Sequence, residues 1–501
     1  MIIKFLAVII REMSFYNYDE HDELMDYIEE DYETTYEEQG RTWKETYESC
    51  IVPSTLQIIW YMLILIGCSF VCRFGVAVCR RFHTKNDLLL HSITIASGCS
   101  MLMIAVGNKW LIIAFFVIMS YAVLHLVNLF DSIRQYIGVI VLLITISTQL
   151  CCEFIWKQQV DWQMIKGSLM VSNMKIISIA FEIGKLNSRN ILIVPNIFSY
   201  FGYIFMPSNL LIGPWVPYSS YLQSLRPKAQ LRLSLRWAIW CSLCSVLSLV
   251  FLNLSNCIVP LLFLSNQSFI WLSIFRNALS VRCSQYFVSF LSQASITAGG
   301  ISLQRGEKPN KWLGPMITRP LNIEVPRSLS SAVKAWNIPM HLFLKEFIFS
   351  GVYERFNSHS VAILTTYFVS ALLHGQYFKI YLVLFSLACF GFVEYKIRNK
   401  ISVIFNACIT SNGCRKPCHF KYCPSKGWRS DGAMFVRFVN ALFSMLTIFH
   451  LAYLGAMMHE SSVEEDTSLF KDIINDFNVW SSVYFINHWI GLLTLIFYFI
   501  I

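Results

Sequence analysis

The stretch WLIIAFFVIMSYAVLHLVNL (residues 110–129) decides the fold class of this chain. It contains no Asp, Glu, Lys or Arg, and it is as long as a helix that crosses a bilayer, which needs about 20 residues. Similar apolar runs recur along the 501 residues, of which 55% are hydrophobic and only 14% charged. A soluble protein would need more charge to cover its surface. We therefore expect a multi-pass membrane protein.

The apolar runs predict an all-α architecture, a multi-pass transmembrane helical bundle of about nine to eleven spans. Lipid cannot satisfy open backbone groups, and the sequence has no alternating pattern typical of a β-barrel. The candidate spans are residues 56–76, 88–107, 110–130, 135–155, 193–213, 235–263, 267–296, 360–376, 379–395, 433–457 and 480–501. Residues 157–192 between them are amphipathic and favour an interfacial or re-entrant helix.

Charge divides the chain into two parts. Residues 1–50 carry 14 acidic and 4 basic residues, and we expect a mostly disordered acidic segment there. Residues 51–501 are basic and form the predicted multi-pass domain. Their Lys and Arg residues cluster at the ends of apolar runs, as expected for cytosolic loops, so we expect contact with membrane lipids and no nucleic-acid partner. The 16 cysteines are too dilute for a secreted disulfide scaffold.

Ionisable residues inside apolar spans are functional candidates because burying them in lipid is costly. Four histidines qualify: His125, His374, His450 and His488. For each, the alternative is a buried histidine that hydrogen-bonds a neighbouring helix.

Context favours His374, which lies in TTYFVSALLHG (365–375). Tyr367 and Ser370 precede it by seven and four residues and so share its helical face. This polar stripe on an apolar helix is suited to lining a cavity. An imidazole can accept a hydroxyl proton near neutral pH.

A second candidate lies in RPLNIEVPRSLSSAVKAWNIPM (319–340). Ser328 is placed to cap the helix that follows. Asn337 comes two residues before Pro339, near a helix break, where its amide can donate to a ligand rather than to its own helix. The alternative is an ordinary polar loop followed by a capped helix.

These two segments together resemble the membrane-bound O-acyltransferase family, which is marked by an Asn in a polar segment and a His in an apolar helix. Further stretches, GPWVPYSSYLQ (213–223), FHLAYLG (449–455) and NHW (487–489), resemble the members that acylate a serine of Wnt proteins. The resemblance runs from about Trp43 to the C-terminus, and nothing is carried over to residues 11–42.

The resemblance implies a helical body with a central substrate tunnel in the endoplasmic reticulum membrane. It implies transfer of a palmitoleoyl group from palmitoleoyl-CoA to a serine of Wnt protein substrates. His374 and Asn337 match the family's catalytic pair. Trp336, Tyr367 and Ser370 fall where the family lines its tunnel. Arg327 is a candidate contact for the CoA phosphates, with a positive-inside topology signal as the alternative. His341 is outside the motif and is left as structural. Acyl-CoA is an activated co-substrate, so we expect no cofactor and no metal.

Cys408, Cys414, Cys418 and Cys423 form a cluster in a basic segment. Their spacing is not the paired CxxC pattern of zinc sites, so the metal signal is weak and we assign no metal. Unmodified or S-acylated thiols, a disulfide and a metal site remain open.

Two other functions compete with the acylation of proteins. One is a member of the same family that acts on a lipid or sterol hydroxyl. The other is a transporter or lipid-binding protein that uses His374 as a proton relay, but we find neither the inverted repeats nor the paired broken helices of that class.

Overall fold

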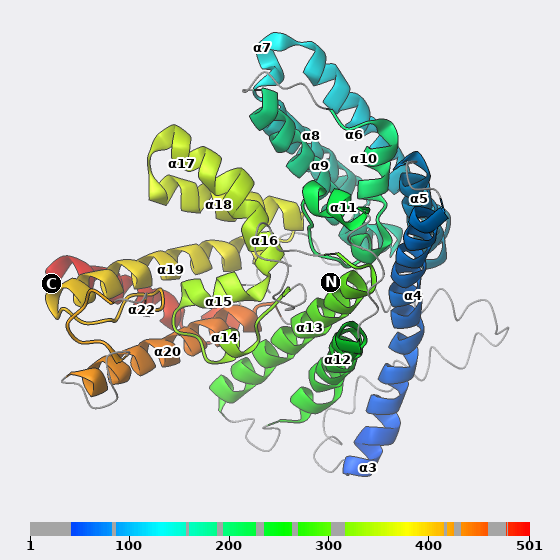
Figure 1. Cartoon of the computed structure of the whole chain (residues 1–501). Helices are drawn as coiled ribbons and strands as arrows, with labels where there is room; N and C mark the ends of the chain where they lie inside the picture. Colours follow the sequence, from blue (N-terminus) through cyan, green and yellow to red (C-terminus); the bar gives the residue numbers. More distant parts are fainter. Residues whose placement is uncertain are drawn as a thin grey trace. The chain divides into compact units, whose positions relative to one another are not determined.

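The computed structural model describes residues 42–82, 87–156, 160–187, 194–226, 235–262, 269–301, 316–414, 418–424, 432–458, 477 and 479–501. Over these residues the chain is almost entirely helical, and its one β pairing is an isolated bridge between Ala407 and Tyr422 (Figure 1). The all-α prediction is confirmed. Most of the acidic segment, residues 1–41, lies outside the described residues, whereas residues 43–50 are already helical.

The chain divides into two compact units. The first comprises Met1–Leu261 and Ser284–Ile317, and the second comprises Leu262–Cys283 and Thr318–Ile501. Helix α13 (Ile270–Ala298) begins in the second unit and ends in the first.

The main helices of the first unit are α3 (Trp43–Thr46), α4 (Val52–Phe82), α5 (Asp87–Val106), α6 (Trp110–Leu129), α7 (Asp131–Arg134), α8 (Ile137–Trp156), α9 (Val160–Asn187), α10 (Ile197–Ile204), α11 (Tyr218–Ser224) and α12 (Leu235–Asn253). The π-helices η2 (Tyr47–Ile51) and η6 (Leu254–Ile258) join α3 to α4 and extend α12.

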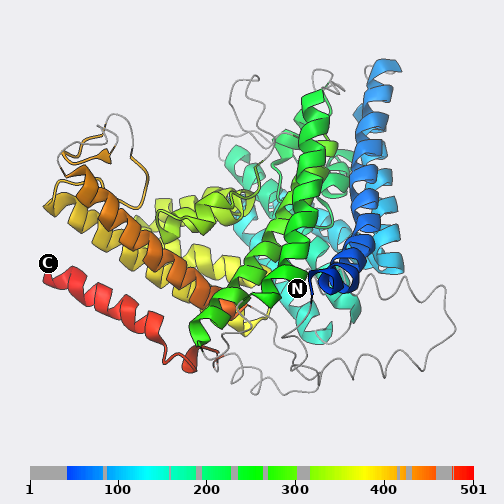
Figure 2. The ribbon, with the colours of Figure 1, turned by 90° about the horizontal axis from the view of Figure 1, so that it is seen from below.

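The helices of the second unit are α14 (Leu321–Glu324), α15 (Leu329–Trp336), α16 (Ile338–Phe343), the π-helix η9 (Leu344–Phe349), α17 (Ser350–Phe356), α18 (His359–His374), α19 (Phe378–Ile404), α20 (Ala433–Ala456) and α22 (Ile486–Ile500). Helix α19 packs against α18, α20 and α22, and α20 and α22 are drawn in orange and red in Figure 2.

Six helical segments among the described residues are long and apolar enough to cross a membrane: Trp43–Phe82, Asp87–Leu129, Ile137–Trp156, Trp237–Leu261, Phe378–Ile404 and Ala433–Ala456. The multi-pass prediction is confirmed. The number is lower than the expected nine to eleven partly because α18 and α22 are short, and partly because the expected neighbours 88–107 and 110–130 form one helical stretch.

The predicted span 193–213 is wrong. Only Ile197–Ile204 forms a helix there, and a short 3-10 turn at Pro207–Asn209 follows it. The helix cannot continue through Pro207, because proline has no backbone N–H to donate. A side chain at Gly213 would also collide with Asn209, whose Cα lies 2.1 Å from the position of an added Cβ. Every residue from Gly202 to Leu210 is buried.

The interfacial prediction for residues 157–192 is also corrected. Every residue from Val171 to Ala180 is buried, so α9 has no lipid-facing and water-facing sides along this stretch. Its two lysines are satisfied internally. Lys166 pairs with Glu153 of α8, and Lys175 Nζ donates to the carbonyls of Tyr203 (3.2 Å) and Ile204 (2.9 Å). These internal partners offset the cost of burying a charged group.

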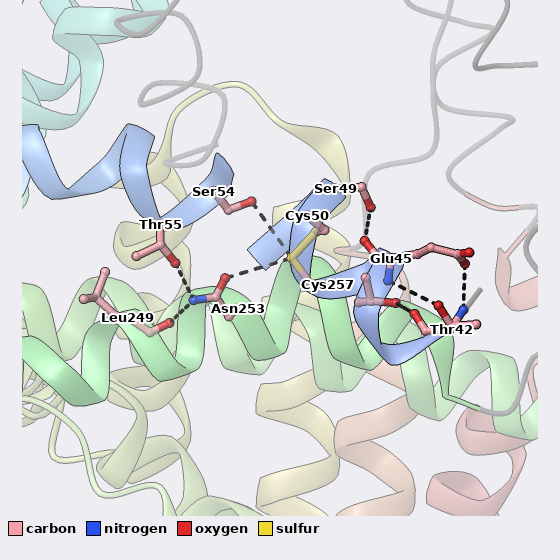
Figure 3. The surroundings of a disulfide bond; sticks show 10 residues. Thr42, Glu45, Ser49, Cys50, Ser54, Thr55, Leu249, Asn253 and Cys257 are labelled. Atoms are coloured by element: carbon pink, nitrogen blue, oxygen red, sulfur yellow. Dashed lines mark hydrogen bonds between the residues drawn. A yellow bond between two sulfur atoms is a disulfide. The ribbon is translucent and has the colours of Figure 1, made fainter. Parts of the chain in front are cut away.

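A disulfide joins Cys50 of η2 to Cys257 of η6 (Figure 3). Beside it, Asn253 Nδ2 donates to Thr55 Oγ1 at 2.9 Å and to the Leu249 carbonyl at 3.0 Å, so α4 and α12 are tied together at this end. Disulfides persist in oxidising compartments. The opposite end of α4 carries Arg80 and Arg81, which mark a cytosolic end. Both signals therefore predict the same orientation of α4, with Cys50 on the side away from the cytosol.

The disulfide yields a first prediction. Cys257→Ser should lower the free energy of unfolding by about 2–4 kcal/mol, because the reduced chain gains conformational freedom on unfolding. It should also expose Cys50 to alkylation. The midpoint of thermal aggregation in detergent and mass-tag alkylation without reductant measure the two effects. Cys151→Ser, at an exposed free cysteine, is the matched control. An unchanged midpoint, with Cys50 alkylated in the unreduced wild type, would contradict the bond.

Candidate functional site

A helical hairpin in the second unit carries the two residues that the sequence singled out. Its first arm is the continuous run α16–η9–α17, from Ile338 to Phe356, and its second arm is α18 (Figure 1). The chain reverses at Asn357, whose φ of 47° lies in the left-handed region that Asn tolerates. Helix α18 then packs back on η9 and α17. At 1.5 Å per residue each arm rises roughly 24–28 Å. Asn337 and His374 therefore lie at the same open end of the hairpin.

Asn337 occupies the break between α15 and α16. Its backbone is extended, with φ −142° and ψ 90°, and its side-chain Oδ1 accepts a hydrogen bond of 3.1 Å from the N–H of Met340. Pro339 fits the first turn of α16 because that turn needs no N–H donor there. The N-cap occupies the amide oxygen and leaves the two amide N–H groups for another acceptor. The expected helix break is present, and the donor role of the Asn337 amide stays a prediction.

His374 is the last residue of α18. The helix stops there because Gly375 has a φ of 89°, which glycine adopts without strain, and the N–H of Gly375 bonds to the Leu372 carbonyl at 3.1 Å. A helix C-terminus carries a partial negative charge and stabilises a nearby cation. A positive charge at this position of α18 would therefore be stabilised by the helix.

The neighbours named with His374 lie on the same helix. Ser370 is buried and Tyr367 is half-buried, as a stripe that faces protein rather than lipid requires. Trp336 ends α15 and is half-buried next to Asn337. The expected cap is present, because Ser328 Oγ accepts from the N–H of Ser331 at 3.1 Å. The catalytic and tunnel-lining roles of these residues stay predictions.

Arg327 has a partner set that sequence reasoning did not anticipate. Its guanidinium donates to the carbonyls of Cys408 and Thr410, at 3.1 Å each. These bonds tie the start of α15 to the loop after α19. Its geometry therefore favours a structural role over binding of the CoA phosphates.

A buried network fixes α15 against α19. Glu394 of α19 accepts from the N–H of Leu329 at 2.8 Å and pairs with Arg398 at 3.3 Å. Arg398 is fully buried and also donates to Asn440 Oδ1 of α20 at 2.7 Å and to the Arg327 carbonyl at 3.1 Å. The network holds α15, and with it Asn337, in place beside the helix that follows His374.

The other three histidines have structural partners. His488 has both ring nitrogens engaged, with Tyr453 Oη at 2.9 Å and Ser386 Oγ at 3.1 Å. His450 is buried and stacks on Phe390 with ring centroids 4.7 Å apart. His125 is exposed and packs edge-on against Tyr121. These contacts fit the alternative interpretation for His488, whereas Nδ1 of the buried His450 has no hydrogen-bond partner and His125 packs at the surface.

An arginine-lined pocket in the first unit was missed by sequence reasoning. Arg73, Arg80 and Arg226 line it, together with Ser208 and Ser224. Arg80 is bonded to Asp87 at 2.7 Å, but Arg73 Nε and Nη1 are buried without a hydrogen-bond partner. Buried donors without a partner are costly, so this pocket suits an anion. The available signal was an arginine inside the predicted span 56–76.

Comparison with known proteins identifies the class. The model of the membrane-bound O-acyltransferase family matches residues 126–416. The chain belongs to this family.

Three individual relatives share one name, which is more specific than that of the family. The chain is 34% identical to "Protein-serine O-palmitoleoyltransferase porcupine" of Drosophila melanogaster, over 91% of this chain and 86% of that protein. It is 29% identical to the protein of that name from Anopheles gambiae, over 91% and 94% of the two chains. It is 28% identical to that of Homo sapiens, over 90% and 96%.

The geometry at Asn337 yields a second prediction. Asn337→Ala should lower the free energy of unfolding by about 1 kcal/mol, because it removes the N-cap of α16. Asn337→Ser should keep that stability, because serine is an equally good cap. If the amide N–H groups act in catalysis, both variants should lose acyl transfer by about 10²–10³-fold. Thermal midpoints and single-turnover rates separate the two roles. Full activity in Asn337→Ser would show that Asn337 is a cap and nothing more.

Proposed function

We propose that this chain transfers a palmitoleoyl group from palmitoleoyl-CoA to a serine of a Wnt protein, in the membrane of the endoplasmic reticulum. The observation that carries the proposal is the similarity, over about nine-tenths of the chain, to proteins named for that reaction. The hairpin that brings Asn337 and His374 to one open end supports it.

The reaction exchanges one ester for another. The serine Oγ attacks the thioester carbonyl carbon, the new C–O bond forms and the C–S bond breaks. The serine proton passes to a base and then to the departing CoA sulfur, so no electrons are transferred. The thioester is already activated, and the remaining barrier lies in orienting a weak nucleophile and stabilising the oxyanion.

His374 is the proposed base. It takes the serine proton, carries it as an imidazolium stabilised by the C-terminal carbonyls of α18, and returns it to the sulfur. Asn337 is the proposed donor to the thioester oxygen, because its Oδ1 is committed to the cap. Ser370, Tyr367 and Trp336 are proposed to line the acyl path next to this pair.

Two features support the proposed compartment. The Cys50–Cys257 disulfide suits an oxidising lumen, and the basic helix ends suit a cytosolic face. A secretory-pathway membrane has both. A secreted protein substrate would meet the enzyme on the lumenal side, and CoA would approach from the cytosol.

The arginine-lined pocket is the proposed CoA phosphate site. Arg73 lies in the half of α4 that leads to Arg80 and Arg81, the predicted cytosolic end. Its two unpartnered nitrogens match a phosphate, which guanidinium groups bind through charge-assisted hydrogen bonds.

A third prediction tests the base. His374→Ala should lower the rate of palmitoleoyl transfer to a Wnt-derived serine peptide by about 10²–10⁴-fold, while acyl-CoA still binds. The rate is measured in membranes at matched expression, with His125→Ala as a control for removing an exposed histidine. Equal rates in wild type and His374→Ala would remove His374 from the mechanism. Transfer to a sterol or lipid but not to the peptide would favour the other acceptor class.

A fourth prediction tests the anion pocket. Arg73→Gln should raise the KM for acyl-CoA by about 10–100-fold with a smaller change in kcat, because one charge-assisted hydrogen bond is lost. Arg81→Gln, at an exposed arginine of the same helix, should leave the KM unchanged. A lowered thermal midpoint with an unchanged KM would instead make Arg73 a packing residue.

A further inference from the structure

Four cysteines of the second unit converge on one point. The Sγ atoms of Cys408, Cys414, Cys418 and Cys423 all lie within 4.8 Å of one another, and those of Cys414 and Cys423 are 3.3 Å apart. The four residues come from the connection between α19 and α20, and the sequence spacing gave little reason to expect them in one cluster.

The backbone brings the two halves of this connection together. Ala407 pairs with Tyr422, the N–H of Cys408 donates to the Tyr422 carbonyl at 2.9 Å, and the N–H of Tyr422 donates to the Asn406 carbonyl at 3.1 Å. Cys408 and Cys423 each directly follow one partner of this bridge. The turn at Asn406 requires a φ of 46°, and Asn406 Oδ1 accepts from the N–H of Lys421 at 3.0 Å. The first and last cysteines are therefore placed side by side by main-chain geometry.

The apolar cluster in the described part of the connection is small. Its buried core consists of Ala407, Ile409 and Val436 in addition to Cys408 and Cys423. So small an apolar cluster gives little stability, and natural folds of this size are usually held by disulfides or a metal. The two buried cysteines are only 2% and 1% exposed, which leaves them poorly placed for acylation.

We infer that Cys408, Cys414, Cys418 and Cys423 bind one zinc ion in a tetrahedral structural site. Zn–S bonds of about 2.3 Å put the four sulfurs of such a site about 3.8 Å apart, which agrees with the observed cluster. Four thiolates in tetrahedral arrangement select zinc over hard cations. On binding, each S–H gives its proton to solvent and a Zn–S bond takes its place, so up to four protons are released and no electrons move.

The position of the cluster indicates which part of the fold a bound ion would stabilise. The carbonyls of Cys408, Thr410 and Ser411, within the connection, accept hydrogen bonds from Arg327 and Ser328. Asn440 of α20 also donates to the Cys408 carbonyl, at 3.2 Å. A zinc ion that fixes these carbonyls would anchor the start of α15, the helix that directly precedes Asn337. The site does not depend on which acyl acceptor the enzyme uses.

The fifth prediction is the metal content of the full-length protein purified in detergent without chelators. Mass spectrometry of the metal should find about one zinc per chain in the wild type and in Cys151→Ser. Cys408→Ser/Cys418→Ser should lose at least 80% of it. Cys423→His should retain it, because imidazole is an equivalent zinc ligand.

A second measurement uses only the wild type, so it still tests the inference if a cysteine variant fails to fold. Titration of the folded wild type with a mercurial thiol reagent should release the zinc as four thiols react, and replacement by Co²⁺ should give the absorption bands of tetrahedral thiolate coordination. Wild type without metal, iron in place of zinc, hydroxylamine-sensitive acyl groups on these cysteines, or zinc retained in the double serine variant would each overturn the inference.

Discussion

The pair formed by Arg398 and Glu394 is the interaction on which the second unit depends. Arg398 is completely buried in a helix apolar enough to span the membrane, and a lone charge there would be prohibitively costly. Its donors reach Glu394, the backbone before α15, the loop after α19 and Asn440 of α20. The backbone before α15, the loop after α19 and helix α20 must therefore take fixed positions around one guanidinium of α19. The position of α15 follows from that requirement.

Local backbone chemistry then places the two candidate catalytic residues. Asn337 lies where one helix ends and the next begins, and His374 lies where a glycine with positive φ stops α18. Both side chains belong to helix ends, where polar groups are not already used within the helix. The left-handed Asn357 closes the hairpin and brings the two ends into register. A polar site is thus built inside an apolar body without breaking the hydrogen bonding of any long helix.

The sequence predicted the helical membrane class, the Ser328 cap and the helix break at Asn337, because these depend on composition and on contacts between near neighbours. It failed where tertiary contacts decide. Lys166 and Lys175 suggested a helix on the membrane surface, but Glu153 and two distant carbonyls satisfy them in the interior. The carbonyl partners of Arg327 lie more than 80 residues away, so the sequence gave no sign of them. Spacing alone also gave no signal that the four cysteines of the α19–α20 connection would meet.

The bond between Cys50 and Cys257 also forms late in the synthesis of the first unit. The two cysteines are 207 residues apart, and a ribosome adds about 5–20 residues per second, so Cys50 is synthesised roughly 10–40 s before Cys257. During that interval α4 through α11 are synthesised, while the Cys50 thiol has no disulfide partner. The disulfide can form only when α12 has the correct orientation, because an inverted α12 would carry Cys257 to the opposite side of the membrane from Cys50.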